Sequence, residues 1–431
     1  MQIVGEPSSK LRNGHTGMVR TALEREVSSV VKTGRCTGCA GCTHVSPRVT
    51  MRETSDGFLR PKVERAAAPS DKAEAARFRN MCPGLRVSAP AVEPGGQLHG
   101  LFGRYHSVWR AWSTDPVIRT AGSSGGVLTA LVSWLIDSGH VSQASGVSAS
   151  ESSPKRSVPV RIMSRDEALA SAGSRYAPVG ALEGASLDSK SALVVKPCEA
   201  VAARSLTGRA DEDGESSGPV LLSFFCAGTP SQNATESLVE EIGLDPDRLK
   251  SLRYRGDGWP GHFKAEDTDG HRSQLTYVES WGSHLGRDLQ TRCKLCVDGT
   301  GESADIAVGD FWDTDDRGYP LFEEQEGISV AIARTRRGQE LLMEAAEAGV
   351  VILESLEMDR LVPVQPLQVK RRQTLPGRLL GRSMAGFPTT KYPGYGILSN
   401  LFRGNLKLYK SALGTFRRSI GSRLRGGSPD R

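Results

Sequence analysis

The most constraining feature of this 431-residue sequence is a run of three cysteines near its beginning. Cys36, Cys39 and Cys42 follow one another with two residues between each pair. At this spacing a single loop can turn all three thiols onto one small object. A cubane iron–sulfur cluster needs such an arrangement, because each corner iron takes one thiolate. Zinc sites usually draw cysteines as pairs from two places, so we expect a [4Fe–4S] cluster here rather than a zinc knuckle or reactive thiols.

The fourth ligand of this cluster is missing from the run itself. The segment resembles the ferredoxin signature Cys-x2-Cys-x2-Cys-x3-Cys-Pro, but Ser46 and Pro47 stand where the last Cys-Pro would be. The nearest replacement is Cys82, which is also followed by proline. A helix capped by Ser70 and running through residues 73–78 would deliver this cysteine at its exit. We therefore predict that Cys82 closes the cluster.

Length and cysteine usage indicate a globular protein in a reducing compartment. A chain of this length buries one large core or two ordinary ones. Residues 1–10 lack the apolar core of a secretory signal, and the longest apolar run, residues 127–136, is too short to span a bilayer. Eight cysteines in such a chain are expected to be cofactor ligands rather than disulfides. The sequence therefore predicts a cytoplasmic protein.

The net charge of +6 is unevenly distributed along the chain. From Lys370 to the end there are 14 basic residues and one acidic residue, which leaves 41 basic and 48 acidic residues before it. Such a tail is either a solvated extension or a surface for an anionic partner. Apolar residues are interleaved with the basic ones: Ile397, Leu398, Leu401, Phe402, Leu406, Leu408, Tyr409, Leu413 and Phe416.

This mixture suits a helix that lies on an anionic membrane or on an acidic protein such as a ferredoxin. A membrane partner would place the protein at the inner face of the membrane. Nothing else in the sequence supports nucleic acid as a partner, so none is expected.

Strand-like and helical segments alternate after residue 97 and predict an α/β fold. Apolar strands are expected at residues 108–112, 192–195, 220–225, 328–333 and 350–353. Helices are expected at residues 127–137, 236–242 and 337–348. We therefore predict a mixed sheet flanked by helices, with a small N-terminal ferredoxin-like [4Fe–4S] module and a basic C-terminal tail. The expected boundaries are a flexible N-terminus at 1–34, the iron–sulfur module at 35–96, the α/β domain at 97–369 and the basic extension at 370–431.

Four more cysteines lie in the predicted α/β domain. Cys198 and Cys226 each follow the carboxyl end of a predicted strand, and open α/β sheets bind ligands at that edge. Cys293 and Cys296 form a second Cys-x2-Cys. Together these residues supply the four thiols that a second cubane or a zinc site requires. Their spacing does not decide between the two metals.

Two further segments are candidate ligand sites. A loop of small residues precedes the predicted helix at 127–137, and the free N–H groups and dipole of a helix start favour a phosphate, although plain capping explains the same residues. In the turn at 252–261, Arg253, Arg255 and Trp259 either present charges and an indole to a ligand or form a plain surface turn. The loop consists of Gly122, Ser123, Ser124, Gly125 and Gly126.

These segments resemble, in order, the motifs of the coenzyme F420 hydrogenase/dehydrogenase beta-subunit family. The resemblance extends from about residue 35 to residue 353 and leaves out the basic tail. Members of that family include deazaflavin-reducing subunits of hydrogenases and formate dehydrogenases, and ferredoxin-linked reductases of chlorophyll intermediates. The matching segments are residues 121–126, 196–198, 225–231, 255–261 and 292–296 with 309–310.

The resemblance implies an oxidoreductase with one FAD, one or more [4Fe–4S] clusters and coenzyme F420 as substrate. It implies that the loop at 122–126 holds FAD by its phosphates, and that the second set of cysteines ligates a cluster near the flavin. Arg175, Arg253, Arg255 and Lys294 are the expected counter-charges for the phosphate and glutamyl tail of coenzyme F420. FAD would stand between clusters, which pass single electrons, and a deazaflavin, which takes a hydride.

Three functions are considered at this point. We predict electron exchange between a one-electron carrier, either ferredoxin or a partner subunit, and coenzyme F420. The second is a ferredoxin-dependent reductase of another acceptor, a tetrapyrrole or a carbohydrate-linked metabolite. The third is an electron-relay or scaffold subunit with zinc at the Cys-x2-Cys sites and no chemistry of its own.

Overall fold

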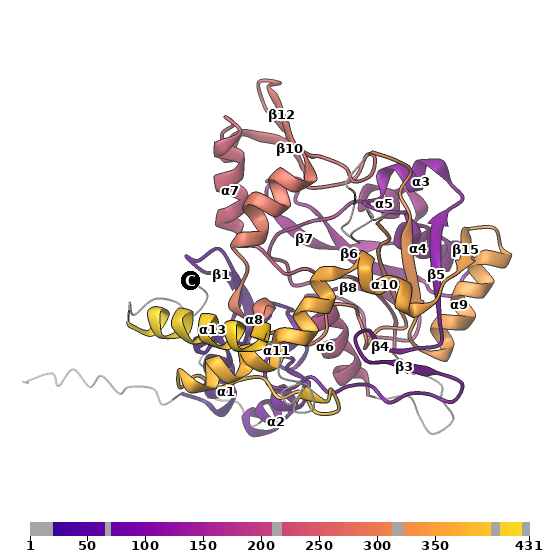
Figure 1. The fold of residues 1–431 in the computed structure, drawn as a ribbon. Coiled ribbons are helices and arrows are strands. Elements are labelled where there is room, and N and C mark those ends of the chain that lie inside the picture. The colour runs from indigo at the N-terminus through magenta and orange to yellow at the C-terminus, as the bar shows by residue number, and fades with distance from the viewer. Residues whose placement is uncertain are drawn as a thin grey trace, which may run out of the picture.

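The protein is built around one large mixed sheet, seen in the computed structural model, which describes residues 20–64, 70–208, 218–312, 321, 324–397 and 406–424 (Figure 1). Four adjacent strands of this sheet run parallel, and antiparallel strands extend it on both sides. The predicted α/β fold with a mixed sheet is confirmed. The eight strands are, in spatial order, β15 (Val351–Ser355), β5 (Ser107–Ser113), β14 (Ser329–Ala333), β13 (Ile306–Asp310), β9 (Val220–Phe224), β8 (Ser191–Val195), β6 (Gln143–Ala149) and β7 (Ser157–Ile162).

Helices cover both faces of the sheet because its central strands are apolar on both sides. Along β8, Leu193 and Val195 belong to one hydrophobic core and Ala192 to the other. Four helices share the core of one face: α3 (Pro116–Ala121), α4 (Val127–Asp137), α5 (Arg165–Ala170) and α9 (Arg336–Glu347). The opposite face packs against α6 (Pro197–Thr207) and, at its other end, against the turn η5 (Met358–Arg360) and α10 (Leu361–Val364).

Most of the expected elements of this domain are found. The five predicted strands correspond to β5, β8, β9, β14 and β15, and α4 has the predicted bounds. The hairpin of β6 and β7 was not expected, because β6 is rich in Ser, Ala and Gly and β7 contains Pro159. β7 is an edge strand, where a proline removes no ladder hydrogen bond.

The N-terminal cysteines belong to a small module at one face of the sheet. It contains α1 (Ala22–Lys32), the turn η1 (Gly41–His44), the hairpin β1 (Val49–Glu53) and β2 (Leu59–Val63), and α2 (Asp71–Met81). Its hydrophobic core is continuous with the sheet, since Leu193 and Leu221 lie in the same cluster. The module therefore packs as part of the main body.

Helix α1 corrects the expectation of a flexible segment at 1–34. Leu23, Val27 and Val30 are buried, and the side chain of Thr21 caps the helix at the N–H of Glu24. Asp71 at the start of α2 accepts a hydrogen bond of 2.6 Å from the N–H of Ala22. The amphipathic spacing of the apolar residues thus outweighs the polar composition of this segment. Residues 1–19 lie outside the described part of the chain.

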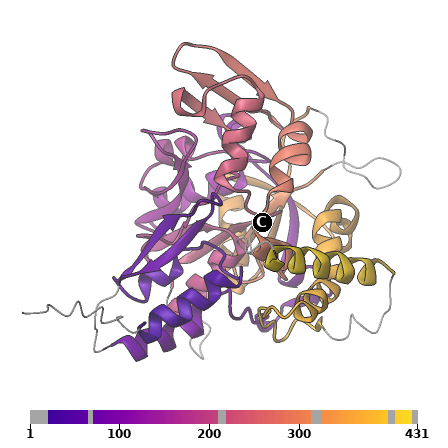
Figure 2. The same cartoon turned by 90° about the vertical axis from the view of Figure 1, so that its left-hand side faces the viewer.

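A second lobe stands at one end of the sheet (Figure 2). Its core is built around the buried rings of Tyr254 and Phe263. A turn at Asp269 and Gly270 joins its last two strands. The lobe comprises α7 (Gln232–Glu241), η2 (Pro246–Arg248), β10 (Leu249–Arg253), β11 (Phe263–Asp267), β12 (Arg272–Leu275), the π-helical turn η3 (Val278–His284) and η4 (Leu285–Arg287). The short hairpin of β3 (Gln97–His99) and β4 (Gly103–Tyr105) and the helix α8 (Thr291–Lys294) complete the domain.

The basic C-terminal segment begins inside the fold. Helix α11 (Pro366–Met384) crosses the predicted boundary at residue 370 and packs against α13 (Leu406–Leu424) (Figure 1). Arg371, Arg372 and Arg382 on α11 are buried, so part of the predicted extension belongs to the core. Of the apolar residues expected in the tail, Leu398, Leu401 and Phe402 lie outside the described residues. No helix among the described residues combines the length and apolar character needed to cross a bilayer.

Candidate functional site

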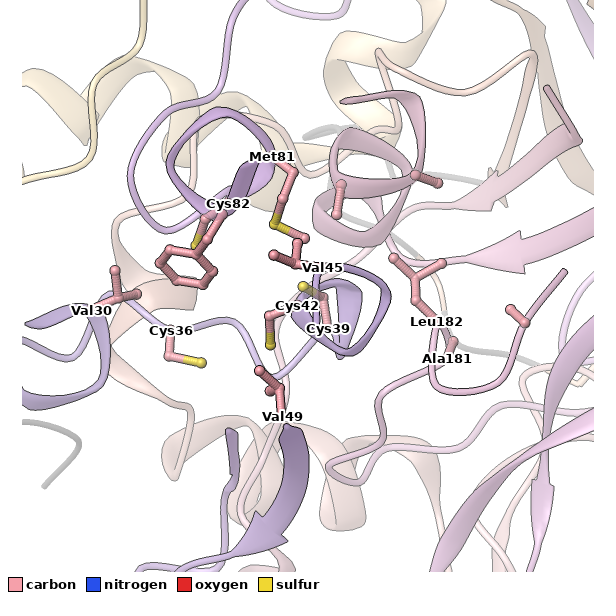
Figure 3. Close-up of a cluster of buried hydrophobic side chains, with 14 of the residues drawn as sticks. Val30, Cys36, Cys39, Cys42, Val45, Val49, Met81, Cys82, Ala181 and Leu182 are labelled. Atoms are coloured by element: carbon pink, nitrogen blue, oxygen red, sulfur yellow. The ribbon is translucent and has the colours of Figure 1, made fainter. Parts of the chain in front are cut away.

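The first cysteine group surrounds a common space (Figure 3). Cys36, Cys39 and Cys42 come from the loop after α1, and Cys82 is the C-cap residue of α2, as the sequence predicted. These four cysteines form no disulfide bond, their side chains are buried, and all four line one narrow hollow. The loop turns tightly because Gly38 takes a φ of 71°, and a Cβ there would lie 3.0 Å from the carbonyl oxygen of Leu59.

Burial makes these thiols poor acids in the absence of a positive charge. It raises the pKa of Cys39 to about 11. The pKa values of Cys42 and Cys82 are also raised, first by burial and then by the charges of the neighbouring thiolates. Thiolates gathered in this way are stable only around a metal or cluster. The donor set therefore fits a metal centre.

A third group of ligand-type side chains lies away from the cysteines. One ligand atom each of Asp267, Asp269 and His271 lies within 4.8 Å of the others. At the exposed hairpin, the ring of His271 lies 2.9 Å from Asp267, so this cluster is explained by its own hydrogen bonding.

The second cysteine group gathers at the carboxyl edge of the sheet. Cys198 lies in the first turn of α6, after β8, and Cys226 follows the neighbouring parallel strand β9. Cys293 lies in α8, with Cys296 two residues beyond the helix. Burial raises the pKa of Cys226 to about 12, and the charges of Cys293 and Cys296 add to this rise. The structure thus brings together the four thiols that the sequence could only group by number.

Three buried or nearly buried cations accompany the second group. Arg371 donates a hydrogen bond of 2.8 Å to the carbonyl oxygen of Cys226 and another to that of Ala227. Its charge opposes the rise in the pKa of Cys226, as does that of Lys196. Burial raises the pKa of Cys296, and Arg292 and Arg371 oppose that rise. Cationic surroundings of this kind stabilise an anionic centre.

The two cysteine groups are neighbours. Burial raises the pKa of Cys198 well above its usual value, and the charge of Cys39 in the first group contributes to the shift. Helix α6, which carries Cys198, packs on η1, which carries Cys42. The contact is close, because a Cβ on Gly41 would lie 3.1 Å from that of Ala202.

A cavity of about 250 Å³ lies between the small-residue loop and the second cysteine group. Its lining includes Gly122, Ser123, Ser124 and Gly126 on one side and Cys226 on the other. The first turn of α4 also lines it, and no side chain caps the N–H groups of that turn. Uncapped N–H groups at a helix start bind anions. A second hollow of about 640 Å³ adjoins the cavity, and the two share lining residues such as Val147 and Ser174.

The glycines of the loop are required by its own packing. A Cβ on Gly125 would lie 2.6 Å from the carbonyl oxygen of Ala111 in β5. Gly126 has a φ of 73°, and a Cβ there would lie 2.8 Å from the carbonyl oxygen of Ile118. The hydroxyl of Ser124 donates to the carbonyl of Ile328. The loop is thus fixed against the sheet, with its backbone at the cavity wall.

Two predicted ligand groups of the turn at 252–261, Arg255 and Trp259, both donate hydrogen bonds to Asp310. Arg255 donates two hydrogen bonds of 2.8 Å to Asp310, and Trp259 donates its indole N–H to the same carboxylate. Trp259 is 2 % exposed and stacks on Trp312, so it is not open to stack on a ligand ring. Arg255 lines the cavity and the second hollow while it is paired with Asp310. Burial corrects the expectation for Trp259, whereas the role predicted for Arg255 stays a prediction.

The other expected counter-charges differ in where they lie relative to the two hollows. Arg175 lines both hollows, but four of its five N–H groups donate to three backbone carbonyls and to the hydroxyl of Ser157. Lys294 lies in α8 and is not part of the lining of either hollow. Arg253 lines the second hollow together with Lys264 and Arg272, two residues that no sequence motif marked.

Sequence reasoning also missed a buried ion pair at the cavity wall. Lys196 and Glu199 lie 2.7 Å apart, and both line the cavity beside Cys198. Lys196 also donates to the carbonyl of Val179, and Glu199 accepts from the N–H of Ala181. The pair secures the start of α6, and therefore Cys198. The Lys-Pro-Cys segment marked Lys196, but nothing in the sequence marked Glu199 as its partner.

Known proteins match this chain over part of its length. The family models for the N-terminal and C-terminal parts of the coenzyme F420 hydrogenase/dehydrogenase beta subunit match residues 108–184 and 188–359. The chain is 24 % identical over 308 residues to coenzyme F420 hydrogenase subunit beta of Methanothermobacter thermautotrophicus, covering 67 % of this chain and 99 % of the relative. It is 28 % identical over 249 residues to F420-dependent formate dehydrogenase 1 subunit beta of Methanococcus maripaludis, covering 56 % of this chain and 59 % of that relative.

A solved structure shares the fold. A chain of the F420-reducing [NiFe] hydrogenase complex from Methanosarcina barkeri, solved in a xenon derivatization study, superimposes with a TM-score of 0.51 and 20 % sequence identity. The match covers 69 % of this chain and 99 % of that one. The matched family regions begin at residue 108, after the first cysteine group.

Proposed function

Because the chain belongs to the coenzyme F420 hydrogenase/dehydrogenase beta-subunit family, we propose that it is an iron–sulfur flavoprotein oxidoreductase. It exchanges electrons between a one-electron carrier, either ferredoxin or a partner subunit, and coenzyme F420. One observation carries this proposal. Cys226, a member of the second thiol group, lines the same cavity as the loop Gly122–Gly126 and the uncapped start of α4.

The chain's own residues have distinct roles in this proposal. When bound, the [4Fe–4S] clusters would supply one-electron steps and FAD would couple them to two-electron hydride transfer. The thiols of each cysteine group hold one cluster, and the backbone N–H groups at the start of α4 hold the flavin phosphates. Arg371 and Arg292 offset the negative charge of the second group. Apolar side chains such as Val132, Val194 and Ile162 line the cavity and exclude water from it.

Coenzyme F420 would occupy the second hollow. Its phosphate and glutamyl tail are anionic, and Arg253, Lys264 and Arg272 line this hollow. Asp257 and Glu266 also line it, and they hold Arg253 and Arg272 in ion pairs of 3.2 and 2.8 Å. The carboxylates position these guanidinium groups at the rim. The substrate's ring would then face the flavin, because the two hollows adjoin.

The redox partner needs a surface of its own. We propose the basic outer face of α13 for an acidic carrier such as ferredoxin or for an anionic membrane. Lys407, Lys410, Arg417 and Arg418 are exposed there, beside the exposed apolar residues Tyr409 and Leu413.

The proposal is tested on anaerobically purified protein. Iron, sulfide, zinc and flavin are quantified on one sample together with its visible spectrum. About eight iron and one FAD per chain are expected for two cubanes and a flavin. Oxidation of reduced coenzyme F420 with a one-electron acceptor is then measured. Zinc without flavin would overturn the oxidoreductase, and full cofactors without deazaflavin oxidation would point to another acceptor.

A further inference from the structure

We propose that Gln290 is a positioning residue that bridges the two cysteine groups and sets the reduction potential of the centre held by Cys293. This inference rests on the proposed function, in which each cysteine group holds a [4Fe–4S] cluster. The inference goes beyond that function, because Gln290 is not a ligand and because the property it sets belongs to only one of the two centres.

Gln290 lies between the two groups and touches both. It immediately precedes α8 and is 2 % exposed. Its side-chain Nε2 donates a hydrogen bond of 3.1 Å to the carbonyl oxygen of Thr37, in the loop between Cys36 and Cys39. The same nitrogen lies 3.4 Å from the Sγ of Cys293. One amide therefore spans the distance from the first cysteine loop to a thiol of the second group.

Arg60 fixes the direction in which this amide points. The Nη1 of Arg60 lies 3.1 Å from the Oε1 of Gln290, and Arg60 is itself buried beside the ring of Phe58. A guanidinium only donates, so it must face the amide oxygen. A carbonyl and a thiolate only accept, so they must face the two N–H groups. The three partners are therefore all satisfied by one orientation of the amide. In that orientation the oxygen faces Arg60 and the nitrogen faces Thr37 and Cys293.

An N–H donor at one sulfur acts selectively on one centre. Reduction adds an electron to the centre, and a hydrogen bond to a ligating thiolate stabilises that added negative charge, which raises the potential. Cys293 also accepts from the N–H of Thr229, at 3.4 Å, and the carbonyl of Thr229 accepts from the N–H of Gln290. When one electron passes from the first centre to the second, the first is oxidised and the second reduced. Gln290 exchanges neither electron nor proton.

The test compares reduction potentials in the full-length holoprotein. Gln290→Leu removes both donors, and the isosteric Gln290→Glu removes them while keeping an acceptor for Arg60. Redox titration followed by electron paramagnetic resonance should show one midpoint potential shifted to more negative values in both variants, further in the Glu variant. A Cys82→Ser background identifies which signal belongs to the first centre. The matched control is Gln232→Leu, another buried glutamine, whose Nε2 donates to the carbonyl of Lys155 and which should shift neither potential.

Each outcome has a defined consequence. Unshifted potentials in both Gln290 variants at full iron content would overturn the role of Gln290, and an equal shift in Gln232→Leu would do the same. Loss of iron in Gln290→Leu leaves the decision to Gln290→Glu, and loss of iron in both would show a structural role instead of tuning. Wild-type protein without iron would remove the proposed function itself, which separates that failure from this one.

Discussion

The two cysteine groups use the same kind of ligand in different surroundings. The first is enclosed mainly by apolar side chains, among them Val27, Val30 and Phe78, with one buried cation, Arg35, near Cys82. The second is accompanied by Arg292, Arg371 and Lys196. Positive charge near a centre stabilises an added electron, so identical ligands acquire different potentials from their neighbours. We expect the second centre to have the higher potential, which directs electrons arriving at the N-terminal module toward the cavity.

The groups also differ in access. Cys36, Cys39, Cys42 and Cys82 are between 6 and 8 % exposed, whereas the four cysteines of the second group are less completely covered. Cys226 opens onto the cavity. In the proposed function, the first group would therefore receive and hold electrons, and the second would deliver them to a ligand beside it.

The largest effect is expected from Cys82→Ser. Of the four ligands proposed for the first group, Cys82 is the one outside the loop at 36–42, and a serine cannot supply the fourth thiolate. Iron content should fall to that of one cluster, about half, while FAD and the second centre remain. Iron, sulfide and flavin analysis of the anaerobic variant measures this. Unchanged iron would show that Cys82 is not a ligand.

Arg371 tests the electrostatic half of the comparison. Arg371→Gln removes a buried charge and the hydrogen bonds to the carbonyls of Cys226 and Ala227. The potential of the second centre should fall and that of the first should not, and the free energy of unfolding should fall by about 2 to 3 kcal/mol. Redox titration and urea denaturation measure the two effects.

The matched variant Arg371→Lys keeps the charge but loses the forked geometry. The potential of the second centre should stay close to the wild-type value. The free energy of unfolding should fall nearly as far as in Arg371→Gln. A potential that falls equally in both variants would mean that hydrogen bonding, and not charge, distinguishes the second group.

Local spacing explains why much of this arrangement was predictable. Cys36, Cys39 and Cys42 lie within one loop, and Cys82 ends a helix whose cap and length are visible in the sequence. Cys198 and Cys226 follow apolar strands that can be recognised one by one. Each of these inferences depends on residues close together in the chain, where periodicity and capping rules apply.

The rest depends on contacts between distant residues. Arg371 reaches Cys226 across 145 positions, and Gln290 reaches Thr37 across 253. The composition of the segment after Lys370 indicated a basic extension. Helix α11 nevertheless buries Arg371 and Arg372 against backbone carbonyls in or next to the second cysteine group. Trp259 was expected at the ligand, but it is buried and donates its indole N–H to Asp310 in β13, which also pairs with Arg255. Charge in a sequence does not reveal which carboxylate it will meet.

A smaller difference concerns pH. Burial raises the pKa of Glu302 from about 4.5 to about 7, although Arg372, 3.1 Å away, opposes the rise. Arg372 also donates to the carbonyl of Val297, next to Cys296, so this carboxyl adjoins the second group. The folded state holds the proton more tightly than the unfolded chain. The stability that the protonated Glu302 carboxyl contributes is therefore complete below pH 4.5 and is lost as the pH rises through 7.

Glu302→Gln should remove this pH dependence, which has a slope of at most about 1.4 kcal/mol per pH unit. Denaturation midpoints between pH 5 and pH 8 measure it, at intervals of about one unit. The control Glu347→Gln, at the exposed end of α9, should leave the slope unchanged. A slope that persists in Glu302→Gln would assign the pH dependence to another group.

The smallest effect on the two centres is expected from the exposed face of α13. Lys410→Glu with Arg417→Glu reverses two exposed charges on its basic face. Each basic residue near an anionic surface contributes about 1 kcal/mol, so association with vesicles containing anionic lipid should weaken by at least about 30-fold. Iron and FAD should be unchanged, because these two side chains are exposed. Vesicle co-sedimentation and a ferredoxin binding assay measure the change.

The matched control separates position from charge. Arg52→Glu with Lys62→Glu makes the same change in net charge on the exposed hairpin of the N-terminal module. If α13 is the docking surface, only the α13 variant loses binding to vesicles. If the control alone loses binding to ferredoxin, the carrier docks beside the first cysteine group, which is where electrons must enter if the second centre has the higher potential. Equal losses in both variants would mean that net charge alone drives association, and the docking surface on α13 should then be abandoned.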